Sequence, residues 1–174
     1  MMNLEKILQK EIFTISLILI LLFSRLIPHP PNFTPLIAVA IMSSYFFKNI
    51  YLSLATLLIS MLLADVFIGF YKHMFFVYLS LSLIVFVFFG ISKKINYKNL
   101  FVFGFLASFI FYLISNFGVW ALGNIYEKNL NGLIECYFLA IPFFKNTVFS
   151  TIFYSYIGFL AADYISPYNY RLKS

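Results

Sequence analysis

Six long runs of apolar residues, separated by short polar joints, occupy almost the whole chain. Hydrophobic residues make up 63% of the sequence and charged residues only 10%. A soluble domain with so few charged side chains would lack the polar surface that water requires. The runs are continuously apolar and do not alternate, which predicts membrane helices and not barrel strands. We therefore expect an all-α membrane protein built as a six-transmembrane-helix bundle.

The length of the chain agrees with six crossings in a single integral membrane domain, residues 1–174. A helix needs about 20 residues to cross a bilayer core about 30 Å thick. The expected spans are Ile12–Ile27, Phe33–Phe47, Ile50–Phe70, Met74–Ile91, Leu100–Leu122 and Phe143–Ala162. The second span is short, so it should be shielded by protein or lie in a thin part of the bilayer.

A further apolar piece, Leu130–Ile141, precedes the last span and contains Glu135. It ends where Pro142 begins and is too short to cross a membrane alone. We expect a short interfacial or re-entrant helix here.

The distribution of basic residues predicts the orientation. If the N-terminus is inside, eight basic residues lie on the inner side: Lys6, Lys10, Lys48, Lys93, Lys94, Lys98, Arg171 and Lys173. Four lie on the outer side: Arg25, Lys72, Lys128 and Lys145. By the positive-inside rule, we expect a multi-pass protein of the inner (cytoplasmic) membrane with both termini in the cytoplasm.

Several classes of function are not expected from this sequence. The net charge of +6 is spread singly or in pairs between apolar runs, which favours contacts with anionic lipid over nucleic acid. The lone Cys136 and the two histidines, His29 and His73, do not make a metal-binding set. There is no phosphate-binding Gly-x-x-x-x-Gly-Lys loop, so any ATP hydrolysis must come from another subunit. No cofactor is expected. Asp65 and His73 could act as acid and base, but the sequence pairs them with no nucleophile or metal-binding motif, so an enzyme is not expected.

Polar side chains instead gather at the outer ends of the expected spans. Their shared depth on separate segments predicts a common pocket, with ligand-binding candidates Asn32, Thr34, Asp65, Asn116, Trp120 and Asn146. The inner half of the spans is nearly all apolar, unlike a pore or a proton wire. The pattern indicates a pocket that opens to the outside and is closed below.

Two of these features have a second, purely structural interpretation. The segment 28–35 contains four prolines and therefore either lines a cavity or forms a stiff turn. Asp65 lies in the outer half of its span, where a carboxylate needs water or a partner. It either faces the pocket or forms an ion pair, with Arg25, Lys72, His73 and Lys145 as the candidate partners.

The remaining candidates are equally open. Trp120 shares a helix face with Asn116, and its ring either stacks on a planar solute or anchors the helix at the membrane interface. Asn146, within Lys145-Asn146-Thr147, either contributes to the pocket or caps the last span beside lipid headgroups.

Four stretches carry a resemblance to a known family: Arg25–Ala40, Leu63–Phe70, Asn116–Trp120 and Pro142–Thr147. They resemble recurring segments of an uncharacterised family of small bacterial six-helix membrane proteins. That family is distantly similar to the substrate-binding S components of energy-coupling-factor (ECF) transporters. The resemblance implies six helices, cytoplasmic termini and a pocket near the outer face.

These observations favour a membrane substrate-binding or uptake protein that is not itself an enzyme. It would capture a small polar or planar solute and rely on energising transporter subunits for transport. The first span, Ile12–Ile27, lacks the Ala-x-x-x-Ala pattern through which S components usually dock, which argues against that mode of docking. The alternative is a structural or accessory membrane protein of a larger complex, with no ligand of its own.

Overall fold

The computed structural model describes residues 4–92 and 95–165. Within these residues the chain forms seven helices and no strand, which confirms the all-α fold class. The helices are α1 (Leu4–Leu26), α2 (Leu36–Phe47), α3 (Ile50–Ile68), α4 (Met74–Gly90), α5 (Leu100–Leu122), α6 (Leu130–Leu139) and α7 (Ile141–Ile165). Four basic residues used for the orientation, Lys93, Lys94, Arg171 and Lys173, lie outside the described residues.

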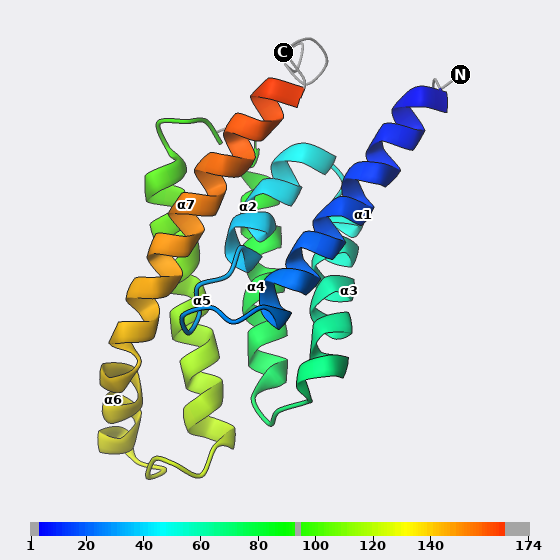
Figure 1. Cartoon of the computed structure of the whole chain (residues 1–174). Coiled ribbons are helices and arrows are strands. Elements are labelled where there is room, and N and C mark those ends of the chain that lie inside the picture. The colour runs from blue at the N-terminus through cyan, green and yellow to red at the C-terminus, as the bar shows by residue number, and fades with distance from the viewer. Residues whose placement is uncertain (1–3, 93–94, 166–174) are drawn as a thin grey trace.

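The helices run alternately up and down, with α6 leading into α7 (Figure 1). The start of α1 and the end of α7 lie at the same end of the bundle, which we call the termini end. The opposite end, called the distal end, contains the last turns of α3 and α5 together with α6 (Figure 1). The chain therefore makes an even number of passages along the bundle.

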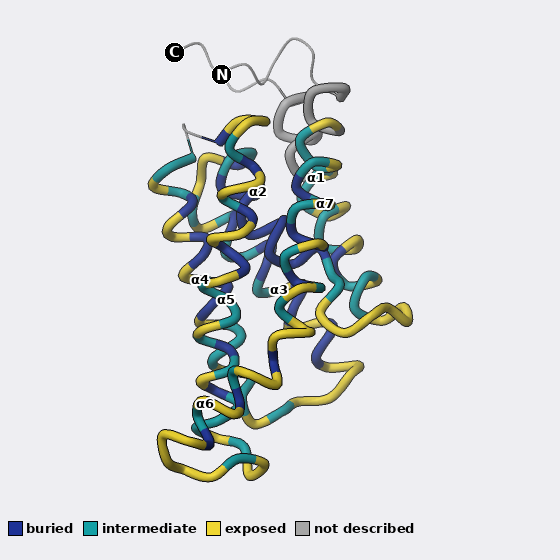
Figure 2. The backbone as a smooth tube through the Cα atoms, turned by 90° about the vertical axis from the view of Figure 1, so that its left-hand side faces the viewer, coloured by how far each residue is buried: buried dark blue, intermediate teal, exposed yellow. Residues whose placement is uncertain are grey.

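Helix α2 forms the centre of the bundle. Every residue from Leu36 to Ser44 is buried, and so is Phe47. Figure 2 shows buried segments gathered in the interior, while exposed ones follow the outer faces and the loops. The 12 residues of α2 span only about 18 Å along the helix axis. As expected from this length, α2 is shielded by protein.

Fewer helices than expected are long and apolar enough to cross a membrane. Among the described residues, α3 and α5 meet both requirements, and α6 and α7 together supply a third if the pair, bent by 46°, counts as one span. The prediction of six such helices is therefore wrong by this measure. The apolar part of α1 (Ile12–Leu26), α2 and α4 each have 10–17 residues, fewer than the about 20 that a crossing needs.

Local sequence signals explain where these helices end. Helix α2 starts after Pro35 and stops at Lys48, whose backbone is left-handed (φ 47°). Asn49 then caps α3 by accepting a hydrogen bond from the Leu52 amide at 3.1 Å. Gly69, with φ 103°, ends α3 in a conformation that favours glycine. Pro142 lies in the first turn of α7, where its missing amide donor is tolerated at the bend from α6.

The outer faces of the bundle suit a lipid environment. Large apolar side chains are strongly exposed on several helices, including Phe67 on α3, Phe75 on α4, Phe101 on α5 and Phe149 on α7. Soluble monomers rarely expose apolar surface so continuously. Together with α3 and α5, these faces indicate a membrane protein.

The interior contains more polar groups than the sequence suggested. Buried hydroxyl side chains lie along the bundle on α2, α3, α4, α5 and α7: Ser43, Ser44, Ser53, Thr56, Ser60, Ser80, Ser108, Ser115, Thr147, Ser150, Thr151 and Ser155. The expected nearly all-apolar inner half is corrected accordingly. Many of these hydroxyls donate to a carbonyl of their own helix, as Thr56 does to Leu52 at 2.8 Å.

Candidate functional site

A cavity of about 310 Å³ lies at the distal end. Helix α5 forms one wall, α6 and the start of α7 form another, and the α1–α2 loop and the start of α4 complete it. The lining residues are Pro31, Asn32, His73, Val77, Phe111, Tyr112, Ser115, Asn116, Val119, Tyr126, Cys136, Leu139, Ala140, Phe143, Phe144 and Thr147. Ligand pockets are usually about 300–1,000 Å³, so this cavity suits a small solute.

Some polar side chains on the α5 wall donate hydrogen bonds to backbone carbonyls of α5 itself. Ser115 Oγ donates to the Phe111 carbonyl at 2.6 Å, and Asn116 Nδ2 donates to the Tyr112 carbonyl at 2.8 Å. The Tyr112 hydroxyl donates across to the Tyr137 carbonyl of α6 at 2.6 Å. These bonds leave the Asn116 Oδ1 atom as the hydrogen-bond acceptor that this side chain offers the cavity.

The cavity carries little charge. None of its lining residues is Asp, Glu, Lys or Arg, and His73 is its one histidine. Burial lowers the pKa of His73 below its usual value, which favours the neutral imidazole. Burial also raises the pKa of Tyr126, so its hydroxyl keeps its proton. The electrostatic character of the walls is therefore neutral.

The proline-rich α1–α2 loop is held against the cavity by α7. Asn146 Nδ2 donates a hydrogen bond to the Pro31 carbonyl at 3.0 Å, and Ser150 Oγ donates to the Asn32 carbonyl at 3.4 Å. Asn32 adopts a left-handed backbone (φ 61°), which asparagine tolerates better than most residues. Segment 28–35 was expected either to line a cavity or to form a stiff turn. Two of its residues, Pro31 and Asn32, line the cavity.

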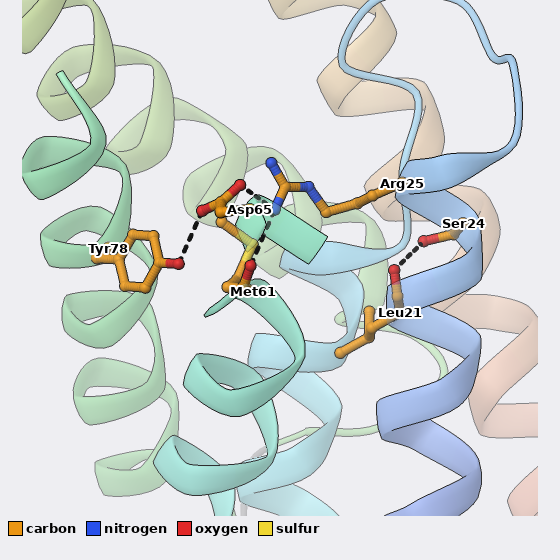
Figure 3. A network of polar contacts seen from close by, with 6 residues as sticks. All are labelled: Leu21, Ser24, Arg25, Met61, Asp65 and Tyr78. Carbon is orange, nitrogen blue, oxygen red and sulfur yellow. Dashed lines mark hydrogen bonds and ion pairs between the residues drawn. The ribbon is translucent and has the colours of Figure 1, made fainter. Parts of the chain in front are cut away.

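Asp65 lies outside the cavity lining, in a buried polar network (Figure 3). Arg25 Nη1 of α1 lies 2.6 Å from Asp65 Oδ1 in an ion pair, and it also donates to the Met61 carbonyl at 3.3 Å. Tyr78 of α4 donates to Asp65 Oδ2 at 2.7 Å. Arg25 is thus the partner of Asp65 among the four candidates, and the pair ties α1 to α3 and α4.

The turn between α3 and α4 borders this network. Burial raises the pKa of Tyr71 in that turn, and the negative charge of Asp65 raises it further. Arg25 acts in the opposite direction through its positive charge and a hydrogen bond. The network therefore extends from α1 to the turn that also carries His73.

Trp120 has a local structural contact and does not line the cavity. Its Nε1 donates to the Glu127 carbonyl at 2.9 Å, and the Lys128 ammonium lies 5.7 Å from its ring centroid. Lys128 Nζ also contacts the carbonyl oxygens of Trp120 and Gly123. These contacts close the loop between α5 and α6.

The cavity therefore brings together part of the predicted set and several residues that were not in it. Asn32 and Asn116 line it, whereas Thr34, Asp65, Trp120 and Asn146 do not. Sequence reasoning omitted six polar lining residues, namely His73, Tyr112, Ser115, Tyr126, Cys136 and Thr147. Ser115 and Thr147 directly neighbour predicted residues, so their position in the chain was a usable signal.

Tyr126 and Cys136 reach the cavity because the α5–α6 connection folds back. Asn129 caps α6 by accepting from the Gly132 amide at 2.9 Å. A Cβ atom at Gly132 would lie 2.2 Å from the Glu127 carbonyl oxygen, so the tight return requires glycine. The pair Asn129 and Gly132 is the sequence signal for this return. Within the described residues, no group of three or more His, Cys, Asp or Glu side chains is placed to hold a metal ion.

Comparison with known proteins identifies a family. No curated protein matches the chain. No solved structure matches it either. Residues 5–171 match a family of unknown function, DUF6580, and this match covers nearly the whole chain. The protein therefore belongs to the DUF6580 family.

Proposed function

We propose that this protein is a membrane solute-binding protein that captures a small polar or planar solute in the distal cavity. The observation that carries the proposal is the cavity itself, about 310 Å³ with aromatic walls and a few polar groups. Ligand sites are typically concave and mostly apolar, with a small number of polar groups that orient the ligand. The proposed role is binding, without catalysis, cofactor or metal.

We further propose that the distal end faces the outside of the cytoplasmic membrane. The split of eight basic residues against four supports this orientation. In this arrangement all six passages lie in the membrane, because α2 is shielded by its neighbours and the bilayer thins around the short apolar part of α1 and around α4. Reporter fusions after Ser174 and within Lys93–Lys98 should both read as cytoplasmic, and an external reading at either position would contradict the proposal.

Inward transport would require a partner, as in the S components of ECF transporters. Two observations support this: the sequence has no nucleotide-binding loop, and α2 fills the bundle beyond the cavity. In liposomes the lone protein should bind its solute without sustained uptake. Rapid, saturable uptake by the lone protein would favour a self-sufficient carrier.

Mass spectrometry of molecules that copurify with the protein tests the proposed binding. Val119→Trp places a large side chain in the cavity wall, and Val102→Trp places the same side chain on the exposed face of the same helix. We expect a small molecule with the unmodified protein and with Val102→Trp, and at least tenfold less with Val119→Trp. Absence of a copurified molecule, or equal amounts in both variants, would favour the structural or accessory role.

A further inference from the structure

We propose that the cavity selects an uncharged solute that combines an aromatic ring with an amide-like hydrogen-bonding edge, which Asn116 and Asn32 recognise. This inference rests on the proposed function, because it assumes that the cavity is a binding site. It goes further by naming the charge and chemical class of the ligand and two residues that determine specificity.

The charge of the ligand follows from the lining. With no Asp, Glu, Lys or Arg in the walls, a buried anion or cation would have no counter-ion there. An unpaired charge loses favourable hydration where it enters the cavity beside the buried residues Ser115, Cys136 and Ala140, which is unfavourable. The neutral His73 and Tyr126 side chains offer hydrogen bonds but no compensating charge. An uncharged ligand avoids this cost.

The hydrogen-bonding edge follows from two asparagines on different segments. Asn116 presents Oδ1 from α5, while its Nδ2 is held by the Tyr112 carbonyl. Asn32 contributes to the cavity from the α1–α2 loop, and its fixed contact is through its backbone carbonyl to Ser150. Among the described residues, no hydrogen bond occupies the Asn32 side-chain amide. An amide accepts and donates at adjacent atoms, which is the complement of another amide or lactam edge.

The aromatic part follows from the rings around the cavity. Phe111, Tyr112, Tyr126, Phe143 and Phe144 all contribute to its lining. The rings of Tyr112 and Phe144 lie 4.8 Å apart, centroid to centroid, with a tilt of 42°. Such an arrangement presents both faces and edges to an inserted ring. The volume of about 310 Å³ leaves room for a small ring system.

Three isosteric probes separate charge from shape: benzamide is neutral, benzoate is an anion and benzamidinium is a cation. Each has one phenyl ring and a planar polar group of similar size. Binding to the purified protein in detergent is measured by ligand-observed nuclear magnetic resonance at millimolar probe concentrations. We expect benzamide to bind about tenfold or more tightly than either charged probe, because only the charged probes require an unpaired buried charge.

Charge-introducing variants test the two asparagines. Asn116→Asp adds a negative charge to the α5 wall with little change in size, and should shift the preference toward benzamidinium at least tenfold. Asn32→Asp tests the loop wall and should act in the same direction. Asn32 is solvent-exposed and aspartate also tolerates its left-handed backbone, so folding should be retained. Asn124→Asp, exposed in the α5–α6 loop outside the lining, is the matched control and should leave the preference unchanged.

The outcomes distinguish this inference from the function on which it rests. Tighter binding of benzoate or benzamidinium to the unmodified protein would overturn the neutral-ligand inference but keep a binding site at the cavity. Failure of both Asp variants to favour benzamidinium, with Asn124→Asp also unchanged, would remove the two asparagines from recognition and overturn the inference. No binding of any probe, together with no copurified molecule, would contradict both proposals.

Discussion

Asp65 is a charged residue buried inside the helix bundle, where its contacts offset the cost of removing a carboxylate from water. Its side chain is fully buried, a position at which an isolated carboxylate would be very costly. Arg25 supplies the opposite charge and Tyr78 supplies a hydrogen bond, so both carboxylate oxygens are contacted. The same residue types would equally suit a ligand site, which explains why the sequence left both interpretations open.

Replacing Asp65 should therefore weaken the fold. Asp65→Asn removes the negative charge and leaves Arg25, whose side chain is only 13% exposed, without its partner. We expect the free energy of unfolding to fall by about 3 kcal/mol, since breaking one half of a buried ion pair is strongly destabilising. Thermal unfolding in detergent measures the change. The double variant Arg25→Met, Asp65→Asn should recover much of the stability, whereas an unchanged single variant would contradict the pairing.

At the scale of elements, close helix contacts position the cavity walls. Gly118 of α5 packs against Phe76 of α4, and a Cβ atom at Gly118 would lie 2.4 Å from the Phe76 Cβ atom. Helix α7 in turn holds the α1–α2 loop through Asn146 and Ser150. The cavity therefore depends on contacts that no single helix makes alone.

A methyl group at Gly118 should separate α4 from α5. We expect Gly118→Ala to lower the free energy of unfolding by about 1–3 kcal/mol, a typical cost of overpacking. Gly90→Ala is the matched control, because nothing lies within 4 Å of a Cβ atom there. Denaturation of the two variants side by side provides the measurement. Equal stability of both would show that α4 and α5 are not closely packed at Gly118.

Removal of the Asn146 amide should loosen the proline-rich loop. Asn146→Leu deletes the hydrogen bond to the Pro31 carbonyl, with an expected cost of about 1 kcal/mol. Hydrogen–deuterium exchange of peptides covering residues 27–35 should become faster. Asn131→Leu, at an exposed position on α6, serves as the control and should not alter exchange in this loop. Unaltered exchange in Asn146→Leu would mean that other contacts hold the loop.

At the scale of the whole molecule, apolar runs were sufficient to predict the helices but not their individual lengths in relation to the membrane. The runs around α3 and α5 correspond to helices of crossing length, whereas Pro35 and Lys48 limit α2 to 12 residues. The depth of polar residues drew attention to the distal end, where the cavity lies. Depth carries no information about the direction of a side chain around its helix, so Asn116 lines the cavity while Asp65 and Trp120 contact other groups.

The most direct test of the central claim is an experimental structure of the protein purified from membranes with its copurified contents. We expect non-protein density in the distal cavity, flat in shape and within hydrogen-bond distance of Asn116 Oδ1. The Arg25–Asp65 pair should remain intact beside it. A cavity closed by its own side chains, or filled by a lipid acyl chain that makes no polar contact, would contradict the proposal that this protein captures a small solute there.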